Sequence, residues 1–188
     1  MARRIPDVLP WVVEAGNPYF DFLFGIGKSQ SVLEAMMHDE RSEIALRRAH
    51  VLLREDRPIG GFIALAGYEL PPARQADLLT MMREVGRDSI ASLRGRLAQT
   101  KALFAPVAPD DYYLSKMGLL PEWRAKGLGK RLLHEYLAQG NANGFTTFRL
   151  DVSEENKAAV SLYRSAGFEV VERTQAAGMS YLAMRLSR

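Results

Sequence analysis

The sequence predicts an α/β protein, in the α+β arrangement, with helices on both faces of a mixed, mostly antiparallel sheet of about six to seven strands. Two observations carry this prediction. Residues 45–72 show a strand–turn–strand pattern typical of an antiparallel hairpin. The last third of the chain alternates strand, helix, strand and helix, which is typical of a parallel pair joined by a crossover helix.

Length and composition are those of one globular domain spanning residues 1–188. Hydrophobic residues make up 47% and charged residues 25% of the chain, which is ordinary for a protein with a sizeable core. Cysteine is absent, so disulfides, cysteine zinc sites and a thiol nucleophile are excluded. No metal is expected, because the three histidines lack the spacing of metal ligands; they are His38, His50 and His134.

The charge balance does not indicate a nucleic-acid or membrane partner. The formal net charge is +3, and the arginines fall in scattered pairs, such as Arg3 with Arg4, without forming one tract. The longest apolar run, near GGFIALAG, is too short to span a bilayer. Pro6, Asp7 and Pro10 interrupt any signal-peptide core. We therefore expect a cytoplasmic protein.

The N-terminal part, residues 1–44, is predicted to be helical. A short aromatic-rich helix is expected at 17–25. A second helix is expected at 29–40, with Ser29 or Ser31 as its N-cap and apolar residues in helical register.

The hairpin and a helical segment follow. The hairpin turns at residues 55–58. Residues 73–104 contain two predicted helices separated near Gly86, each with apolar side chains at helical spacing. These side chains are Leu78, Met82 and Val85 in the first helix, and Ile90, Leu93 and Leu97 in the second.

The last third contains the remaining strands and two helices. The strands are expected at 110–120, 145–152, 168–174 and 179–186. The helix at 128–139 is expected to end at Gly140. The helix at 156–166 has Ser153 as its expected N-cap and Gly167 just after its last turn.

The sequence FGIGKSQ at 24–30 contains Gly-Lys-Ser, the end of a phosphate-binding P-loop. That loop requires a further glycine at position 22, where this chain has Phe22. No suitable apolar strand leads directly into the segment either. A nucleoside triphosphatase is therefore not predicted.

The segment RAKGLGKRLL at 124–133 is a stronger candidate for an anion site. It lies between a predicted strand and an amphipathic helix, where backbone N–H groups are free to bind a ligand. Gly127 and Gly129 allow the main chain to approach a ligand closely, and successive amides can form a concave anion nest. The alternative is a turn shaped by two glycines, with the side chains of Arg124, Lys126 and Lys130 in solvent.

The helix at 156–166 carries two polar side chains that share one face. Asn156 and Tyr163 are seven residues apart, which corresponds to two helical turns or about 10 Å. An amide and a phenol at that separation suit an elongated ligand. The alternative is that Tyr163 fills the core with its hydroxyl hydrogen-bonded.

Together these motifs resemble the GNAT superfamily of acyl-coenzyme A-dependent N-acyltransferases. LLPEWRAKGLGKRLL matches the family's Arg/Gln-x-x-Gly-x-Gly/Ala loop, and NKAAVSLYRSAGF matches its Asn…Leu-Tyr-x-x-x-Gly-Phe helix. The resemblance implies a single GNAT-like domain whose sheet is splayed between its two central parallel strands. It places an acyl-coenzyme A-binding core at 110–171 and a C-terminal strand region at 172–188. Residues 1–44 and 73–104 would form the variable acceptor side.

The resemblance also implies a cosubstrate, acetyl-coenzyme A, and a set of residues that bind it. Asn156 and Ala159 would contact the pantetheine arm. The backbone at the end of the preceding strand would pair with that arm; its residues are Met117, Gly118 and Leu119. The loop amides would bind the pyrophosphate; they belong to Arg124, Ala125, Lys126, Gly127, Leu128, Gly129 and Lys130.

The implied activity is that of an acyl-coenzyme A N-acyltransferase, in which an amine attacks the thioester directly in a ternary complex. A backbone N–H near 117–119 would stabilise the oxyanion, and Tyr163 would protonate the departing thiolate as general acid. Some relatives carry a glutamate base at the position of Tyr113. The base therefore stays open between a water relay and three carboxylates, those of Asp110, Asp111 and Glu69.

Other functions and several acceptors also stay open. A coenzyme A-binding regulatory module without transfer activity is the main alternative, and a nucleic-acid binder rests only on the basic charge. The acceptor would be a small-molecule or peptide amine, such as a protein N-terminus, a lysine, a polyamine, an amino acid or an aminoglycoside. The helices at 73–104 are a candidate homodimer surface. An aromatic acceptor groove competes with simple core packing for four side chains, Tyr19, Phe20, Phe22 and Phe24.

Overall fold

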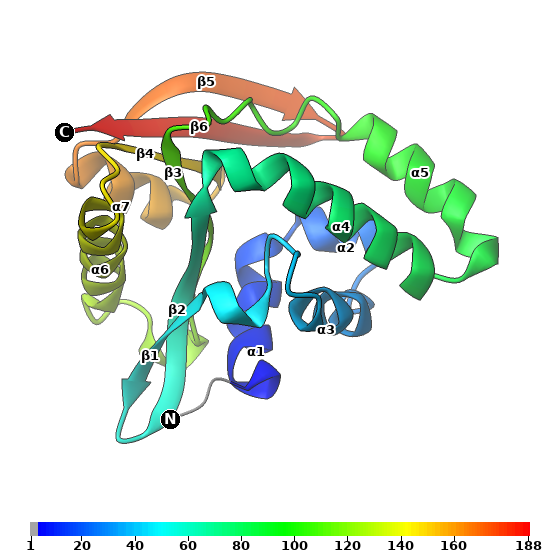
Figure 1. The fold of residues 1–188 in the computed structure, drawn as a ribbon, viewed down its shortest axis with the longest axis horizontal. Coiled ribbons are helices and arrows are strands. Elements are labelled where there is room, and N and C mark those ends of the chain that lie inside the picture. The colour runs from blue at the N-terminus through cyan, green and yellow to red at the C-terminus, as the bar shows by residue number, and fades with distance from the viewer. Residues whose placement is uncertain (1–3) are drawn as a thin grey trace.

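The computed structural model describes residues 4–188 (Figure 1), so Arg3 lies outside it. The helices are α1 (Ile5–Gly16), α2 (Tyr19–Phe24), α3 (Gln30–His38), α4 (Leu70–Glu84), α5 (Ile90–Gln99), α6 (Leu128–Ala142) and α7 (Lys157–Ser165). The strands are β1 (Ala49–Arg54), β2 (Arg57–Ala66), β3 (Asp111–Leu119), β4 (Thr147–Ser153), β5 (Glu169–Ala176) and β6 (Met179–Ser187).

The strands form one six-stranded sheet in the order β1-β2-β3-β4-β6-β5. Within the described chain only β3 and β4 are parallel neighbours, which confirms the mixed, mostly antiparallel fold. Their register runs from Asp111 opposite Thr147 to Leu114 opposite Leu150 and then stops. Both strands continue beyond that point, so the sheet is splayed between them, as the family resemblance implies.

Helices cover both faces of the sheet. Figure 1 shows α6 and α7 on one side and α1, α3 and α4 on the other. On the first side, Tyr136 of α6 packs on Phe62 and Phe148 of the sheet. On the second side, the buried Trp11 and Leu33 share a core with the sheet. The splayed strands therefore have a separate core on each face.

A one-residue bulge in β3 changes which side chains face each core. Leu114 pairs with Ala64 and Lys116 with Ile63, so Ser115 is an extra residue on β3. Tyr112 and Leu114 before the bulge, and Met117 and Leu119 after it, pack on the α6–α7 side. As a result, three side chains face the opposite side, those of Tyr113, Ser115 and Lys116.

Two predicted helix boundaries are wrong. Gly140 does not end α6 but lies inside it. Glycine is required at this position because a Cβ there would stand 2.4 Å from the Phe148 ring. The missing side chain lets α6 approach the sheet closely. Ser153 ends β4 and does not cap α7; the cap is Asn156, whose Oδ1 accepts the Ala159 N–H at 3.1 Å.

The expected inner face of α4 is also partly wrong, since Leu78 is 37% exposed. The helix instead buries Asp77 and Thr80 together with small residues. Ser29 stands at the N-cap position of α3, but its side chain makes no capping hydrogen bond. The apolar periodicity of α4 predicted the wrong buried face, because α4 makes polar tertiary contacts through Asp77, which are described below.

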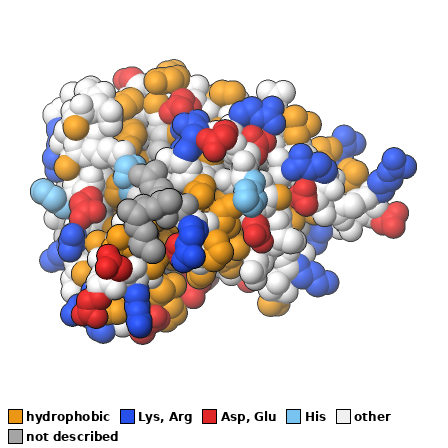
Figure 2. All heavy atoms as spheres, turned by 60° about the horizontal axis from the view of Figure 1, so that its bottom comes forward, with side chains coloured by type: hydrophobic (Ala, Val, Ile, Leu, Met, Phe, Trp, Pro, Cys, Tyr) orange, Lys and Arg blue, Asp and Glu red, His pale blue; other side chains and the backbone are white. Residues whose placement is uncertain are grey.

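The described surface shows no segregation of charge on the face in Figure 2. On the face in Figure 2, basic side chains are interspersed with acidic ones. Among residues 4–188, no helix combines the length and apolarity that crossing a bilayer requires. The same part of the chain holds no group of three or more histidine, cysteine, aspartate or glutamate residues able to hold a metal ion.

Candidate active site

A cavity of about 280 Å³ lies in the opening between β3 and β4, and we call it the strand cavity. It brings together four of the residues that the sequence singles out, namely Met117, Asn156, Ala159 and Tyr163. Leu114 and Leu150, the last paired residues of the two strands, also line it. The cavity therefore begins where the parallel hydrogen bonding ends.

Tyr163 reaches this cavity from α7 with only 6% of its surface exposed. Burial raises the pKa of Tyr163 above its ordinary value, so the phenol stays protonated at neutral pH. No group within residues 4–188 hydrogen-bonds its hydroxyl. The side chain thus packs in the core, as one sequence reading proposed, yet keeps a free proton donor.

The loop before α6 has the backbone shape of an anion nest. Ala125 has φ +58° and Gly127 has φ +76°, both left-handed. Within the described chain, the N–H groups of residues 125–129 donate no hydrogen bond. Gly129 lies against Leu162 of α7, which places the loop beside the helix that carries Tyr163. The loop itself lies outside the strand cavity.

The basic side chains of this loop are partly engaged. Arg124 forms an ion pair with Glu14 of α1, and its Nε donates to the Leu119 carbonyl at 3.0 Å. Lys126 stands over the Trp123 ring at 4.9 Å. Arg124 and Lys126 therefore already have partners, whereas the amides of residues 125–129 have none among the described residues.

The two other predicted backbone positions lie further along β3. Gly118 and Leu119 pair with β2, and neither lines the strand cavity. A Cβ at Gly118 would stand 2.8 Å from the Trp11 carbonyl, so glycine lets α1 cross the strand closely. Met117 is the predicted backbone position that the cavity includes.

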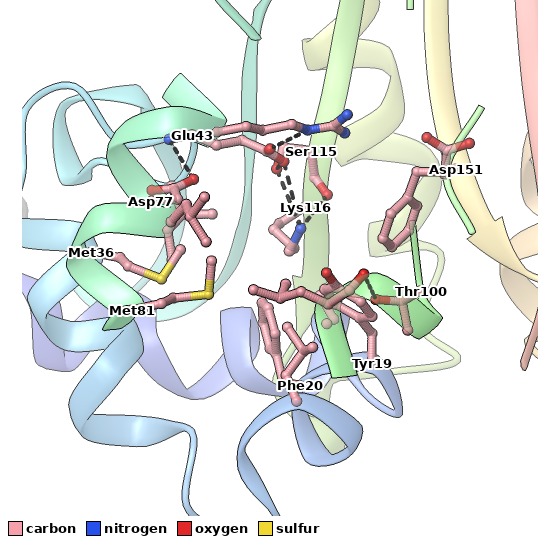
Figure 3. Close-up of a pocket in the computed structure, with 18 of the residues that line it drawn as sticks. Tyr19, Phe20, Met36, Glu43, Asp77, Met81, Thr100, Ser115, Lys116 and Asp151 are labelled. Atoms are coloured by element: carbon pink, nitrogen blue, oxygen red, sulfur yellow. Dashed lines mark hydrogen bonds and ion pairs between the residues drawn. The ribbon is translucent and has the colours of Figure 1, made fainter. Parts of the chain in front are cut away.

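A second cavity, of about 360 Å³, adjoins the first, and we call it the aromatic cavity (Figure 3). Tyr19, Phe20 and Phe24 line it, whereas Phe22 does not. Its other lining residues come from α1 to α5, from the segments that follow α3 and α5, and from the strands β3, β4 and β6. The two cavities share five lining residues, namely Ala15, Ser115, Lys116, Asp151 and Tyr181.

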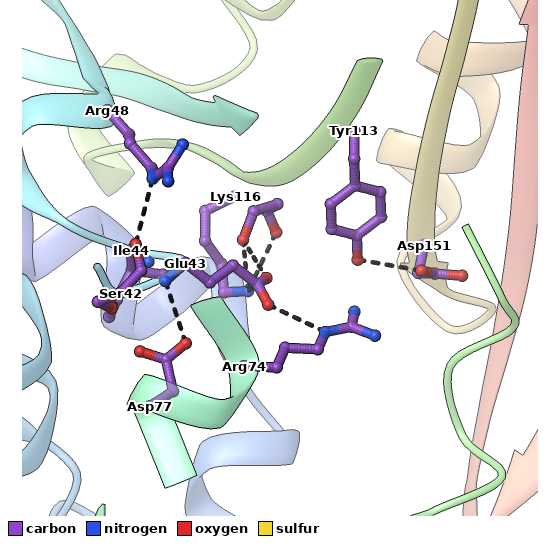
Figure 4. Close-up of polar contacts among 10 residues, drawn as sticks. Ser42, Glu43, Ile44, Arg48, Arg74, Asp77, Tyr113, Lys116 and Asp151 are labelled. Atoms are coloured by element: carbon purple, nitrogen blue, oxygen red, sulfur yellow. Dashed lines mark hydrogen bonds and ion pairs between the residues drawn. The ribbon is translucent and has the colours of Figure 1, made fainter. Parts of the chain in front are cut away.

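A buried polar network forms one wall of the aromatic cavity (Figure 4). Glu43 accepts hydrogen bonds from Ser115 Oγ at 2.5 Å and from Arg74 Nε at 3.1 Å, and Lys116 Nζ lies 3.9 Å away. Burial raises the pKa of Glu43, but the Arg74 and Lys116 charges outweigh burial and hold it below its ordinary value. Burial likewise lowers the pKa of Lys116.

Asp77 supports this network from α4. Its Oδ2 accepts the backbone N–H of Glu43 at 3.2 Å. Burial, with a smaller contribution from the negative charge of Glu43, raises the pKa of Asp77 to about 7. Sequence patterns gave no signal for Glu43 or Asp77, because the hydrogen bonds of these residues join segments far apart in the chain.

The carboxylates expected as bases lie elsewhere. Glu69 pairs with Arg48, Asp111 pairs with Arg185, and Asp110 is exposed. None of the three carboxylates lines either cavity. Tyr113, at the position where some relatives carry glutamate, instead donates its hydroxyl proton to Asp151 Oδ2 at 3.0 Å.

Curated relatives match about a third of the chain. N-alpha-acetyltransferase RimI of Mycobacterium tuberculosis is 40% identical over 63 residues, which is 34% of this chain and 38% of that protein. Mycothiol acetyltransferase of Thermobifida fusca is 43% identical over 56 residues, 30% of this chain and 17% of that protein. The [ribosomal protein bS18]-alanine N-acetyltransferase of Salmonella typhimurium is 34% identical over 62 residues, 33% and 42% of the two chains. The matched stretch thus spans less than half of each relative.

Solved structures share the fold over the whole chain. An N-acetyltransferase from Staphylococcus aureus superposes with a TM-score of 0.72 at 16% identity, covering 98% of this chain and 97% of that one. Another acetyltransferase crystal structure gives a TM-score of 0.71 at 17% identity, covering 100% and 97%.

The family itself follows from the sequence match. The sequence model described as "Acetyltransferase (GNAT) family" matches residues 28–168, three quarters of the chain. That stretch contains the loop before α6, the helix that carries Tyr163 and the splayed strand pair. The chain therefore belongs to the GNAT acetyltransferase family.

Proposed function

We propose that this protein transfers an acetyl group from acetyl-coenzyme A directly to an amine. The observation that carries the proposal is the joining of two cavities at the opening between β3 and β4. One cavity adjoins the α7 face with Tyr163, and the other lies among the N-terminal helices. A thioester and an amine entering from these two sides would meet in the opening.

The donor would bind on the α6–α7 side. The unpaired amides of 125–129 would hold the pyrophosphate, with the partial positive charge at the start of α6 adding to them. The β3 edge at Met117 has no strand partner on the β4 side, so the pantetheine arm would pair there. The Asn156 amide nitrogen stays available to that arm, because its Oδ1 is the atom that caps α7.

The acceptor would bind in the aromatic cavity. Its walls include residues between 15 and 44 and residues of the helices α4 and α5, which supports the assignment of these segments to the acceptor side. Tyr19, Phe20 and Phe24 offer apolar and aromatic surface to the body of an amine. We therefore propose an acceptor with an apolar or aromatic portion, either a small molecule or a peptide.

The chemistry would be a single displacement. The amine nitrogen attacks the thioester carbonyl, a backbone N–H near 117–119 stabilises the oxyanion, and the C–S bond breaks. The Tyr163 phenol then gives its proton to the departing thiolate. Coenzyme A chemistry also fits the cytoplasmic location expected from the sequence.

The proposal is tested by incubating the full chain with acetyl-coenzyme A and a panel of amines. The panel contains 2-phenylethylamine, spermidine and a hexapeptide that begins with alanine. We expect thiol release that depends on the amine, with the acetylated amine confirmed by mass spectrometry. Tight acetyl-coenzyme A binding without thiol release for any amine would favour the non-catalytic module.

A further inference from the structure

Asp151 occupies a special place among the acidic residues of the two cavities. The strand cavity is lined by Glu14, Asp151 and Glu155, and the aromatic cavity by Glu43, Asp77 and Asp151. Asp151 is thus the one carboxylate, among described residues, that lines both. It stands one position beyond Leu150, where β3 and β4 separate. This is the place where the two proposed substrates would meet.

The carboxylate of Asp151 is held by two hydrogen bonds. Tyr113 Oη donates to Oδ2 at 3.0 Å (Figure 4). Arg149 Nη2 donates to Oδ1 at 3.0 Å. The Asp151 side chain is only 2% exposed, as is that of Arg149. Such contacts fix the position of the carboxylate and compensate its charge.

The strand geometry places Asp151 and Tyr163 on opposite faces of the sheet. Leu150 and Val152 belong to the core that contains Tyr163. Because side chains alternate along a strand, Asp151 between them points to the other face. Figure 3 shows it at one end of the aromatic cavity, with Asp77 at the other end. A proton acceptor and a proton donor therefore flank the opening.

We propose that Asp151 is the general base of the acyl transfer, a catalytic assignment that rests on the proposed function. Its carboxylate accepts a proton from the protonated amine, either directly or through the Tyr113 hydroxyl, and the free amine then attacks the thioester. The C–N bond forms, the nitrogen loses its second proton to solvent, the C–S bond breaks, and Tyr163 protonates the thiolate. Solvent returns a proton to Tyr163 and removes one from Asp151, so the net products are an amide, coenzyme A and a proton.

The charged groups around Asp151 suit this role. Arg149, Tyr113 and Arg74 favour the ionised carboxylate, but burial outweighs them and raises the pKa of Asp151. A higher pKa makes a carboxylate a stronger proton acceptor. Lys116 on β3 and Tyr181 on β6 also interact electrostatically with Asp151. Glu43 is a further charged group that lines the aromatic cavity together with Asp151.

The first test compares Asp151→Asn with the wild type on two classes of nucleophile. The three panel amines are protonated at neutral pH and need a base, whereas phenylhydrazine and hydroxylamine are already unprotonated. We expect kcat to fall roughly 10²–10⁴-fold for a panel amine used by the wild type, and far less for the unprotonated nucleophiles. Enzyme-free rates are subtracted, and the Kd for acetyl-coenzyme A should change less than about twofold.

A second variant covers the case in which Asp151→Asn does not fold, since it leaves Arg149 without its counter-charge. Tyr113→Phe keeps the ring and the Arg149–Asp151 pair but removes one hydrogen bond to the carboxylate. Because that bond lowers the pKa of Asp151, its loss should move the acid limb of the kcat/KM profile to higher pH. Asp110→Asn, exposed and outside both cavities, is the matched control and should change neither measurement.

The outcomes separate this inference from the proposed function. If the wild type transfers acetyl groups while Asp151→Asn and Tyr113→Phe keep wild-type kcat and pH profiles, Asp151 is not the base. Equal losses by Asp151→Asn on protonated and unprotonated nucleophiles would also overturn the assignment, because they indicate a structural defect. A wild type that transfers to no amine overturns the proposed function, and the base with it.

Discussion

Ser115 Oγ and a Glu43 carboxylate oxygen lie 2.5 Å apart although the residues are 72 positions apart in the sequence. The contact exists because the β3 bulge turns Ser115 and Lys116 toward the same cavity as Tyr113. Glu43 then serves as the common counter-charge for Lys116 and Arg74. One carboxylate therefore organises a wall of the proposed acceptor site.

Glu43→Gln is expected to destabilise the fold. The variant keeps the shape but leaves Lys116 and Arg74 without their shared counter-charge. We expect the free energy of unfolding to fall by about 1–3 kcal/mol, below the value for a fully buried pair because Arg74 is 40% exposed. Denaturant titration measures the change, with Glu34→Gln on the exposed side of α3 as control. If Glu43→Gln and Glu34→Gln have the same free energy of unfolding, the Glu43 network does not stabilise the fold.

Tyr163→Phe is expected to impair the chemical step and spare binding. The variant keeps the ring in its core contacts with Phe168 and removes only the proposed proton donor. The value of kcat should fall roughly 10²–10⁴-fold. Calorimetry should give an unchanged Kd for acetyl-coenzyme A. An unchanged kcat would remove Tyr163 from the mechanism.

Gly127→Val is expected to weaken acetyl-coenzyme A binding sharply. The new side chain would point into open space where the proposed pyrophosphate lies, and it would also strain a left-handed residue. Gly86→Val is the matched control, because Gly86 has a similar φ of +75°, equally open space and a position outside both cavities. Calorimetry should show weaker binding for the first variant only. Equal affinities would reject the pyrophosphate assignment.

Asp77→Asn is expected to change how stability depends on pH. Asp77 has a pKa of about 7 in the fold against an ordinary value of 3.8, so between these values the folded chain binds more protons than the unfolded chain. This group therefore makes the free energy of unfolding decrease as pH rises from about 4 to 7. Replacing it should remove that contribution, so the variant gains stability relative to the wild type as pH rises.

The measurement for Asp77 is a set of denaturant titrations from pH 4 to pH 8, read as the difference between wild type and variant. Asparagine can still accept the Glu43 N–H, so the loop contact is preserved. Asp88→Asn, on an exposed turn, should show no such pH-dependent difference. A constant difference across the range would mean that Asp77 titrates normally.

Local sequence patterns predicted the family and the elements of the proposed donor side. The loop at 124–130 and the helix with Asn156 and Tyr163 are contiguous motifs, and the parallel strand pair follows from the order of elements around them. The splay of that pair was implied by the family resemblance that the two motifs carry. Such features depend on backbone geometry and periodicity within short segments, which the residues of that segment largely determine. Several details inside these elements were nevertheless wrong, such as the end of α6 at Gly140, where packing on Phe148 explains the glycine.

Only the tertiary structure determined the wall of the proposed acceptor site and the candidate base. Strict alternation along β3 would place Lys116 on the face of Leu114, and the inserted Ser115 reverses this. Asp151 appears in the sequence as one polar residue between two core positions of a strand, and nothing local links it to Tyr113. Hydrogen bonds and packing between distant segments determine the positions and the protonation of Lys116 and Asp151. A sequence motif contains only residues that are adjacent in the chain, so it cannot specify contacts that the whole fold creates.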